Sequence, residues 1–281
     1  MKPLDTIRRT RGTVRLAPGL QQTVRTAALR GLVPRQVWNR LHPTGTWTLH
    51  DPDGIPFLYH AAREDLMARC VVWTDLRHWE ETTQPVLFEL ARTARGFLDV
   101  GAFSGIYTLL ACQANPELRV VAMEPNPHTI GMLRRNVEIN GLGDRVTLVQ
   151  KALSDGPGRA RLAIPYDTTA ASLNAATVPV RSVEVEVSTA DEVVGDQPID
   201  LVKIDVEGLE PEVLHGMTRT IAAHRPAIIA ECLDAPALER LRATADALGY
   251  RTVQHLGRTG LSPAGEGFVP PPFYANFLLT P

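Results

Sequence analysis

Short apolar runs alternate with helix-like patterns from about residue 96 to the end of the chain. Each run is bounded by a turn signal or by proline, which is typical of buried strands. The runs predict strands at residues 97–100, 119–123, 146–149, 200–204 and 227–230. Because several of the intervening segments repeat apolar residues at helical spacing, the pattern predicts an α/β fold with a mostly parallel sheet.

Three later stretches depart from this alternation. Residues 160–164 and 183–187 alternate apolar and polar positions, which predicts a hairpin or edge pair inserted in the sheet. Residues 257–272 are rich in glycine and proline and predict a loop. Residues 273–279 form a last strand, and because no helix precedes it we expect it to run antiparallel.

The N-terminal third follows a different pattern. Residues 16–41 repeat apolar and basic positions like an interrupted amphipathic helix, residues 47–58 predict a small hairpin turned at an Asp-Gly pair, and residues 85–95 predict a helix. We therefore divide the chain into a basic extension or lid over residues 1–95 and a main domain over residues 96–281. Packing of the extension on the main domain is the favoured interpretation.

Charge is distributed unevenly along the 281 residues. The whole chain has 29 basic and 31 acidic residues, a formal net charge of -2, but residues 1–40 contain nine basic residues and one acid, Asp5. The extension therefore carries +8 and the rest of the chain -10. This basic arm is a candidate contact for an acidic carrier, a lipid surface or a second subunit.

The N-terminus lacks the apolar core of a signal peptide, and the chain contains no apolar run of 18 residues. Its three cysteines form no CxxC pair. These features predict a cytoplasmic protein without a transmembrane segment, a disulfide framework or a structural zinc site.

The strongest local motif follows the first predicted strand. Residues 97–105 place an acid, Asp99, near the end of the strand and two glycines, Gly101 and Gly105, in the turn that opens a helix. Such a turn lets a ligand approach backbone N–H groups. The third glycine of a dinucleotide-binding motif is missing, and no phosphate-binding P-loop is present.

A second acid, Glu124, ends the next predicted strand, 25 residues after Asp99. A carboxylate at this point can hold both hydroxyls of a ribose. It can also merely cap the following helix. Together the two acids favour a nucleoside ligand.

Six stretches of this chain resemble the FkbM-type S-adenosylmethionine-dependent methyltransferases. They are DVGAFSGIYTLL at 99–110, VAMEPNP at 121–127, LRRNVEINGL at 133–142, KALSD at 151–155, IDLVKIDVEGLEPEVLHGM at 199–217 and RPAIIAEC at 225–232. The resemblance implies a class I, Rossmann-like fold with a mostly parallel seven-stranded sheet and an antiparallel last strand. The block around residues 205–208 is the most family-specific.

The resemblance also implies a role for each matching residue. Gly101, Ala102 and Phe103 would form the turn under the methionine moiety, and Tyr107 and Thr108 would lie close to its carboxylate. Glu124 would hold the ribose, and Asn126 and Ala152 would border the adenine. The implied cofactor-binding residues are Asp99, Gly101, Ala102, Phe103, Tyr107, Thr108, Glu124, Pro125, Asn126 and Ala152. Phe103 stands where the family usually has Asn, which removes a polar contact.

Methyl transfer to an alcohol needs a base, because the alcohol's pKa lies far above neutral pH. Asp205, Glu207 and Glu231 are expected at the carboxyl edge of the sheet, where open α/β folds bind their ligands. These carboxylates could raise one another's pKa, or Asp205 and Glu231 could share a divalent ion such as Mg²⁺. The structural alternatives are that Glu207 caps a helix and Glu231 pairs with an arginine.

The resemblance, together with this carboxylate cluster, implies an O-methyltransferase acting on a sugar, glycoside or polyketide-type hydroxyl, whereas motif spacing alone would give only a nucleoside-binding α/β domain. Nucleic acid is not expected as a substrate, because no Asn/Asp-Pro-Pro-aromatic motif follows the fourth strand. Alternatives are a small-amine N-methyltransferase, a non-catalytic cofactor-binding module and an NAD-dependent oxidoreductase. Candidate substrate walls are residues 165–179, residues 257–272, Trp38, Trp47, Trp73 and Trp79, although burial in the core is the more frequent outcome for such tryptophans.

Overall fold

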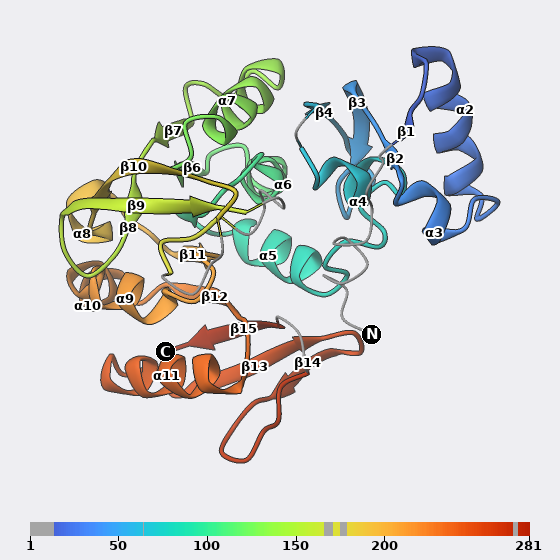
Figure 1. Ribbon diagram of the computed structural model, residues 1–281. Helices are drawn as coiled ribbons and strands as arrows, with labels where there is room; N and C mark the ends of the chain where they lie inside the picture. The colour runs from blue at the N-terminus through green and yellow to red at the C-terminus, as the bar shows by residue number, and fades with distance from the viewer. Residues whose placement is uncertain (1–13, 64, 166–170, 175–178, 272–274) are drawn as a thin grey trace.

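The computed structural model describes residues 14–63, 65–165, 171–174, 179–271 and 275–281. Its centre is an eight-stranded sheet in the order β14-β13-β15-β12-β11-β5-β6-β7 (Figure 1). Five adjacent strands are parallel: β5 (Gly96–Val100), β6 (Arg119–Met123), β7 (Val146–Val149), β11 (Leu201–Ile204) and β12 (Ala227–Cys232). These bounds agree with the predicted strands to within two residues.

Two hydrophobic clusters lie on opposite faces of the sheet, because successive strand residues point to opposite sides. Phe97 packs in the cluster that contains residues of three helices, α5 (Thr83–Ala91), α6 (Ile106–Ala114) and α7 (Thr129–Ile139). Leu98 and Val100 pack in the other, with α8 (Ala190–Val194), α9 (Glu210–His215), α10 (Thr218–His224) and α11 (Ala235–Ala247). The predicted α/β class is confirmed.

The C-terminal strands extend the sheet beyond β12. The last strand, β15 (Ala275–Thr280), is antiparallel to β12, as predicted. Two strands, β13 (Thr252–Gly257) and β14 (Gly260–Pro263), form an antiparallel hairpin that pairs with β15. The predicted loop over 257–272 is therefore wrong at its start: its glycines turn a hairpin, and β14 becomes an eighth strand.

The insertion after β7 forms a separate sheet. Its strands β9 (Gly158–Ile164) and β10 (Arg181–Ser188) are antiparallel, which confirms the predicted pair. However, β10 also pairs with the short strand β8 (Ala152–Leu153), and the three strands lie outside the main sheet. The expectation that they enter the main sheet is wrong, because their own small apolar cluster provides the packing.

The N-terminal segment begins, within the described residues, with two helices and a hairpin. Helices α2 (Pro18–Leu29) and α3 (Arg35–Trp38) replace the predicted interrupted helix, and the short strands β1 (Val14–Arg15) and β2 (Leu41–His42) pair with each other. The predicted hairpin is confirmed as β3 (Gly45–His50) and β4 (Pro56–Ala61). A further helix, α4 (Ala68–Val72), precedes α5.

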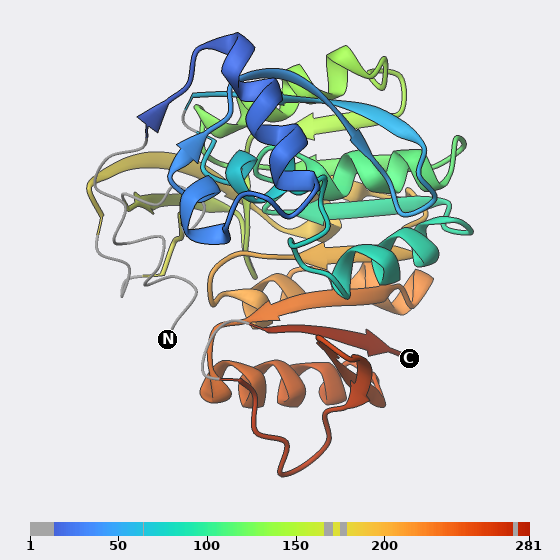
Figure 2. The ribbon, with the colours of Figure 1, turned by 90° about the vertical axis from the view of Figure 1, so that its right-hand side faces the viewer.

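The hairpin is joined to α7 by two asparagine side chains. Asn136 Oδ1 accepts a hydrogen bond of 2.6 Å from the His60 backbone N–H, and Asn140 bonds both the N–H and the C=O of Leu58. Trp38, Trp47, Trp73 and Trp79 are buried in the same hydrophobic cluster as Phe97. The N-terminal segment therefore packs against the sheet (Figure 2). The division at residues 95 and 96 stays a prediction.

In the part of the chain that the structure describes, no helix combines the length and hydrophobicity needed to cross a membrane.

Candidate functional site

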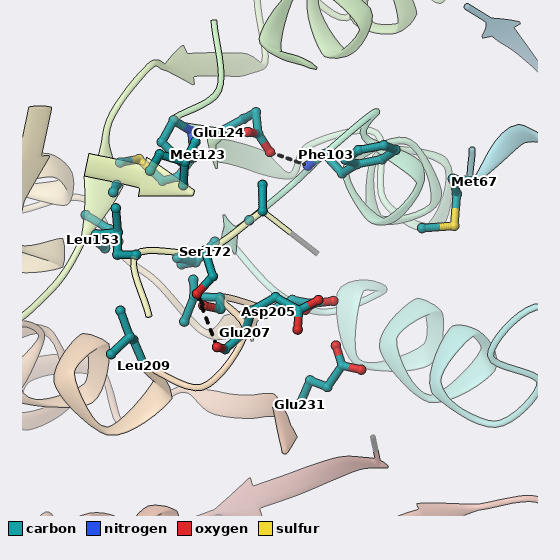
Figure 3. Close-up of a pocket in the computed structure, with 18 of the residues that line it drawn as sticks. Met67, Phe103, Met123, Glu124, Leu153, Ser172, Asp205, Glu207, Leu209 and Glu231 are labelled. Carbon is teal, nitrogen blue, oxygen red and sulfur yellow. Dashed lines mark hydrogen bonds between the residues drawn. The ribbon is translucent and has the colours of Figure 1, made fainter. Parts of the chain in front are cut away.

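A cavity opens at the carboxyl ends of the central parallel strands (Figure 3). It encloses about 1360 Å³, including space that is open to solvent. Four strand ends contribute Gly101 after β5, Glu124 after β6, Asp205 after β11 and Glu231 on β12. The N-terminal segment contributes Leu66, Met67, Cys70, Trp79 and Glu80, and the insertion contributes Leu162, Ala171, Ser172 and Leu173.

The turn after β5 is fixed by its own backbone. The N–H groups of Gly101 and Ala102 both donate to the Met123 carbonyl, at 3.0 and 2.9 Å. Gly101 has a φ of 81° and Phe103 a φ of 49°, and the second value is unusual for a bulky residue. The Phe103 N–H donates to Glu124 Oε2 at 3.0 Å. Gly101, Ala102 and Phe103 thus line a recess continuous with the cavity.

Glu124 is held in one orientation at the end of β6. Besides the bond from Phe103, its Oε1 accepts the Asn126 N–H at 2.8 Å. Burial raises the pKa of Glu124 to about 7. The following helix, α7, begins at Thr129 without a side-chain cap. The helix-capping alternative is therefore wrong, and the carboxylate faces the cavity instead.

Asp99, Tyr107 and Thr108 lie beside the turn at different depths. Asp99 and Tyr107 line the recess next to the main cavity. Thr108 is fully buried behind Asp99 and donates to its Oδ2 at 2.6 Å. Burial raises the pKa of Asp99 to about 6. Thr108 thus orients Asp99, and it lines neither the cavity nor the recess.

Pro125, Asn126 and Ala152 border the other side of Glu124. Pro125 and Ala152 line the cavity. Asn126 is only 1% exposed, and its Oδ1 accepts a hydrogen bond from the His128 N–H. Among the residues that the structure describes, its Nδ2 has no hydrogen-bond partner, so this buried donor lacks an acceptor of its own.

Asp205 and Glu231 form a carboxyl pair at the ends of neighbouring strands. A hydrogen bond joins them, and burial together with the Asp205 charge raises the pKa of Glu231 well above its usual range. Burial opposes ionisation of Asp205 too, but the ammonium of Lys203 and the bond to Glu231 outweigh it and lower its pKa. The environment therefore favours the ionised form of Asp205 and the protonated form of Glu231.

Glu207 reaches the same cavity from an unusual backbone conformation, with a φ of 59°. Its carbonyl accepts a hydrogen bond from the Ser172 hydroxyl at 3.2 Å, which ties the insertion to this loop. The N-cap position of helix α9 is Leu209, which makes no side-chain cap bond, so Glu207 does not occupy the N-cap position. Glu231 pairs with Asp205 rather than with an arginine, which excludes the other structural alternative.

Lys203 and Glu80 are functional candidates that the sequence analysis missed. Lys203 is 1% exposed, its Nζ lies 3.3 Å from Asp205 Oδ2, and it sits 5.7 Å from the centre of the Tyr107 ring. Glu80 accepts hydrogen bonds from the Tyr107 hydroxyl and from Asn276 Nδ2. A lysine within the otherwise apolar strand LVKI is a signal that could have been used. Glu80 lies 125 positions before Asp205, and no local pattern marks it.

The predicted substrate wall and the predicted metal ligands remain to be compared with the structure. Of the four tryptophans, Trp79 lines the cavity, whereas Trp38, Trp47 and Trp73 belong to the core alone. Part of the expected wall over 165–179 lies outside the described residues. Within those that are described, no three His, Cys, Asp or Glu side chains form a group suited to a metal ion.

Known proteins resemble this chain over its central part. The family model for the methyltransferase FkbM domain matches residues 99–252. Methyltransferase 1 of Beauveria bassiana is 27% identical over 142 residues, which cover 43% of this chain and 57% of that protein. Methyltransferase sdnD of Sordaria araneosa is 28% identical over 154 residues, with coverages of 43% and 59%. The matched segment thus spans under two thirds of these relatives' length.

A solved structure, methyltransferase FkbM from Methylobacillus flagellatus KT, superposes with a TM-score of 0.46 at 16% identity. The superposition covers 78% of this chain and 55% of that one.

Proposed function

Because the chain belongs to the FkbM family of methyltransferases, we propose that it is an O-methyltransferase that moves the methyl group of S-adenosylmethionine to a hydroxyl of a small molecule. The observation that carries this proposal is the Asp205–Glu231 pair, which faces the same cavity as Glu124. One end of the cavity then suits the nucleoside, and the other end suits a proton transfer.

The residues around Glu124 fit S-adenosylmethionine, whose sulfonium supplies the reactive methyl group when it is bound. The oriented Glu124 carboxylate would accept hydrogen bonds from the ribose hydroxyls. The orphaned Nδ2 of Asn126 is a donor suited to an adenine nitrogen, with Pro125 and Ala152 beside it. Residues 101–103 would cradle the methionine moiety, with Asp99 and Tyr107 in the adjoining recess.

Asp205 is the base in this proposal. An alcohol reacts with a sulfonium only as its proton leaves, so a carboxylate must lie beside the hydroxyl. Lys203 keeps Asp205 ionised, whereas Glu231 keeps a proton of its own. The Asp205 oxygen that does not contact Glu231 would accept the hydroxyl proton, and Glu207 lies close enough in the cavity to orient the acceptor.

The acceptor would carry an apolar body beside its hydroxyl. Apolar side chains line much of the cavity, among them Met67, Trp79, Phe103, Leu162 and Leu173. An aromatic and aliphatic wall of this kind suits either the apolar face of a sugar or a polyketide scaffold.

Asp205→Asn tests the base assignment. We expect this variant to bind S-adenosylhomocysteine like the unmodified protein in a calorimetric titration, and to lose about 10²- to 10⁴-fold in turnover of a hydroxyl acceptor. Glu239→Gln, at an exposed acid on α11, is the matched control and should change neither. Repeating the titration with Mg²⁺ tests whether a divalent ion joins the site.

Three outcomes would revise the proposal. Absence of S-adenosylhomocysteine binding by the unmodified protein would remove the cofactor assignment. Full activity of Asp205→Asn on a hydroxyl acceptor would remove Asp205 from proton transfer. Turnover of small amines alone, with little effect of the substitution, would favour N-methylation, because an amine can lose its proton to solvent before it reacts.

A further inference from the structure

A chain of buried hydrogen bonds links the N-terminal segment to the glycine turn. Tyr59 on β4 donates its hydroxyl proton to Asp65 Oδ2. Its oxygen lies 2.8 Å from the hydroxyl of Ser104 in the turn. Because the single tyrosine proton points to Asp65, Ser104 is the donor in the second bond. Tyr59 and Asp65 are 0% exposed and Ser104 is 1% exposed, so water does not compete for these bonds.

Asp65 anchors the chain of bonds at the wall of the cavity. Its Oδ1 accepts the Ala68 N–H at 3.1 Å, at the start of α4. The two residues that follow Asp65, Leu66 and Met67, line the cavity. Burial raises the pKa of Asp65 to about 6, and the bond from Tyr59 opposes this rise. Tyr59 therefore links the cavity wall to the glycine turn and fixes their relative positions.

The turn needs such a support, because its backbone is strained. Phe103 has a φ of 49°, which a bulky side chain adopts only when its surroundings impose it. Besides the backbone bonds of the turn, three contacts with side chains hold it: the Phe103 N–H on Glu124, Asn136 Nδ2 on the Ser104 carbonyl at 2.8 Å, and the Ser104 hydroxyl on Tyr59. Only the third comes from outside the matched residues 99–252.

We propose that Tyr59 and Asp65 are positioning residues for the glycine turn, so that the N-terminal segment sets the affinity for the methyl donor. The identity of the ligand rests on the proposed function. Neither side chain lines the cavity or its recess, and both act through Ser104. Without this contact the turn also populates less strained conformations. Only the fraction of molecules with the strained turn can then bind the cofactor, so the apparent affinity falls by that fraction.

Calorimetric titration with S-adenosylhomocysteine tests the proposal on the full chain. We expect Tyr59→Phe to weaken binding by about tenfold at unchanged stoichiometry, as the loss of the buried hydrogen bond that reaches the turn, the one with Ser104, predicts. Ser104→Ala, which removes the other partner, should weaken it similarly. The double variant should bind no worse than either single one, because both changes break the same contact. In turnover assays, KM for the donor should rise while kcat is nearly constant.

Tyr250→Phe is the matched control. Tyr250 is 2% exposed, and its hydroxyl donates to the Pro226 carbonyl at 2.8 Å, so this substitution removes a buried tyrosine hydrogen bond elsewhere in the fold, where Tyr59→Phe removes two. It lies away from the turn and should lower the melting temperature without changing affinity. A purely structural role of Tyr59 would likewise lower the folded fraction, and hence the binding stoichiometry and apparent kcat, but not the affinity of the folded molecules.

The outcomes separate this inference from the proposed function. Binding by the unmodified protein that is unchanged in Tyr59→Phe and Ser104→Ala would overturn the inference and leave the cofactor assignment standing. If Tyr59→Phe fails to fold, Asp65→Asn replaces it, because the Asp65 side chain lines neither the cavity nor the recess, whereas Ser104 lines the recess. Unchanged affinity in Asp65→Asn and in Ser104→Ala would then overturn the inference. If the unmodified protein itself does not bind S-adenosylhomocysteine, the proposed function fails, and this inference with it.

Discussion

The carbonyl oxygen of Asp205 lies 2.0 Å from the point where a Cβ atom on residue 101 would stand. Gly101 is therefore the residue that lets the end of β11 approach the end of β5. At this short separation the Asp205 N–H donates a hydrogen bond to the Val100 carbonyl at 3.0 Å. The glycine that shapes the cofactor turn thus also places the carboxylate that we assign as the base.

Gly101→Ala should destabilise the protein strongly. The new methyl group would meet backbone, which cannot move aside as a side chain can, and the φ of 81° disfavours alanine in any case. We expect the free energy of unfolding, measured in urea, to fall by more than about 2 kcal/mol. Gly131→Ala is the control: this helical glycine has open space around it, so alanine should stabilise α7 by about 0.5–1 kcal/mol. An unchanged Gly101→Ala protein would contradict the close approach.

Glu124 should make cofactor binding depend on pH. Its pKa is about 7 in the free protein, and ribose hydroxyls donate to the ionised carboxylate, so binding favours loss of the proton. The affinity for S-adenosylhomocysteine should therefore rise with pH through 7, and be about tenfold weaker at pH 6 than at pH 8. Calorimetric titrations at both pH values measure this difference.

Glu124→Gln provides the control for that pH dependence. Glutamine retains one oxygen acceptor but cannot ionise, so binding should be weaker at pH 8 and nearly flat between pH 6 and pH 8. Asp99, with a pKa of about 6, would account for a residual slope at the acid end. An equal slope in the variant and the unmodified protein would assign the titration to another group.

Local motifs made the carboxylates at the strand ends predictable. Asp99, Glu124 and Asp205 each end a strand, and parallel strands bring their ends to one edge, so the sequence pattern alone predicted that they lie near each other. The structure places Glu124 and Asp205 in the same cavity and Asp99 in the recess beside it. Strand bounds followed from the same short apolar runs.

Residues that depend on long-range packing were not predictable in this way. Glu80 and Tyr59 act on residues of the main domain across gaps of 27 and 45 positions, and neither stands in a recognisable motif. Lys203 has the sequence context of a buried strand, and only the neighbouring carboxylates explain why a charge is tolerated there. The strand β14 was missed because glycines in a tight hairpin resemble those of a loop.

Lys203→Met should be much more damaging at neutral than at acid pH. The ammonium lowers the pKa of Asp205, so its removal leaves an uncompensated buried carboxylate that must be protonated or exposed. We expect a loss of about 3–5 kcal/mol in the free energy of unfolding at pH 8, and a smaller loss at pH 5. Lys151→Met, which breaks an exposed pair with Glu186, should cost less than about 1 kcal/mol at either pH. Equal losses at both pH values would show that Lys203 contributes packing rather than charge.

Stability of the free protein should decrease as pH rises from about 5 to 8. Glu124 and Glu210 have pKa values of about 7 in the folded state because both are buried, whereas the unfolded chain releases these protons near pH 4.5. Between these values the folded protein holds more protons than the unfolded chain, so the free energy of unfolding falls with rising pH.

Glu210→Gln isolates one of these groups. Its carboxylate accepts the Gly208 N–H at 3.0 Å, and glutamine can keep this bond without ionising. The variant should therefore gain stability at pH 8, by at most about 3 kcal/mol, and gain little at pH 5. Urea unfolding at both pH values measures the difference, and Glu239→Gln on the surface should show none. A free energy of unfolding that does not change between pH 5 and pH 8 in the unmodified protein would mean that these carboxyl groups ionise in the folded state as readily as in water.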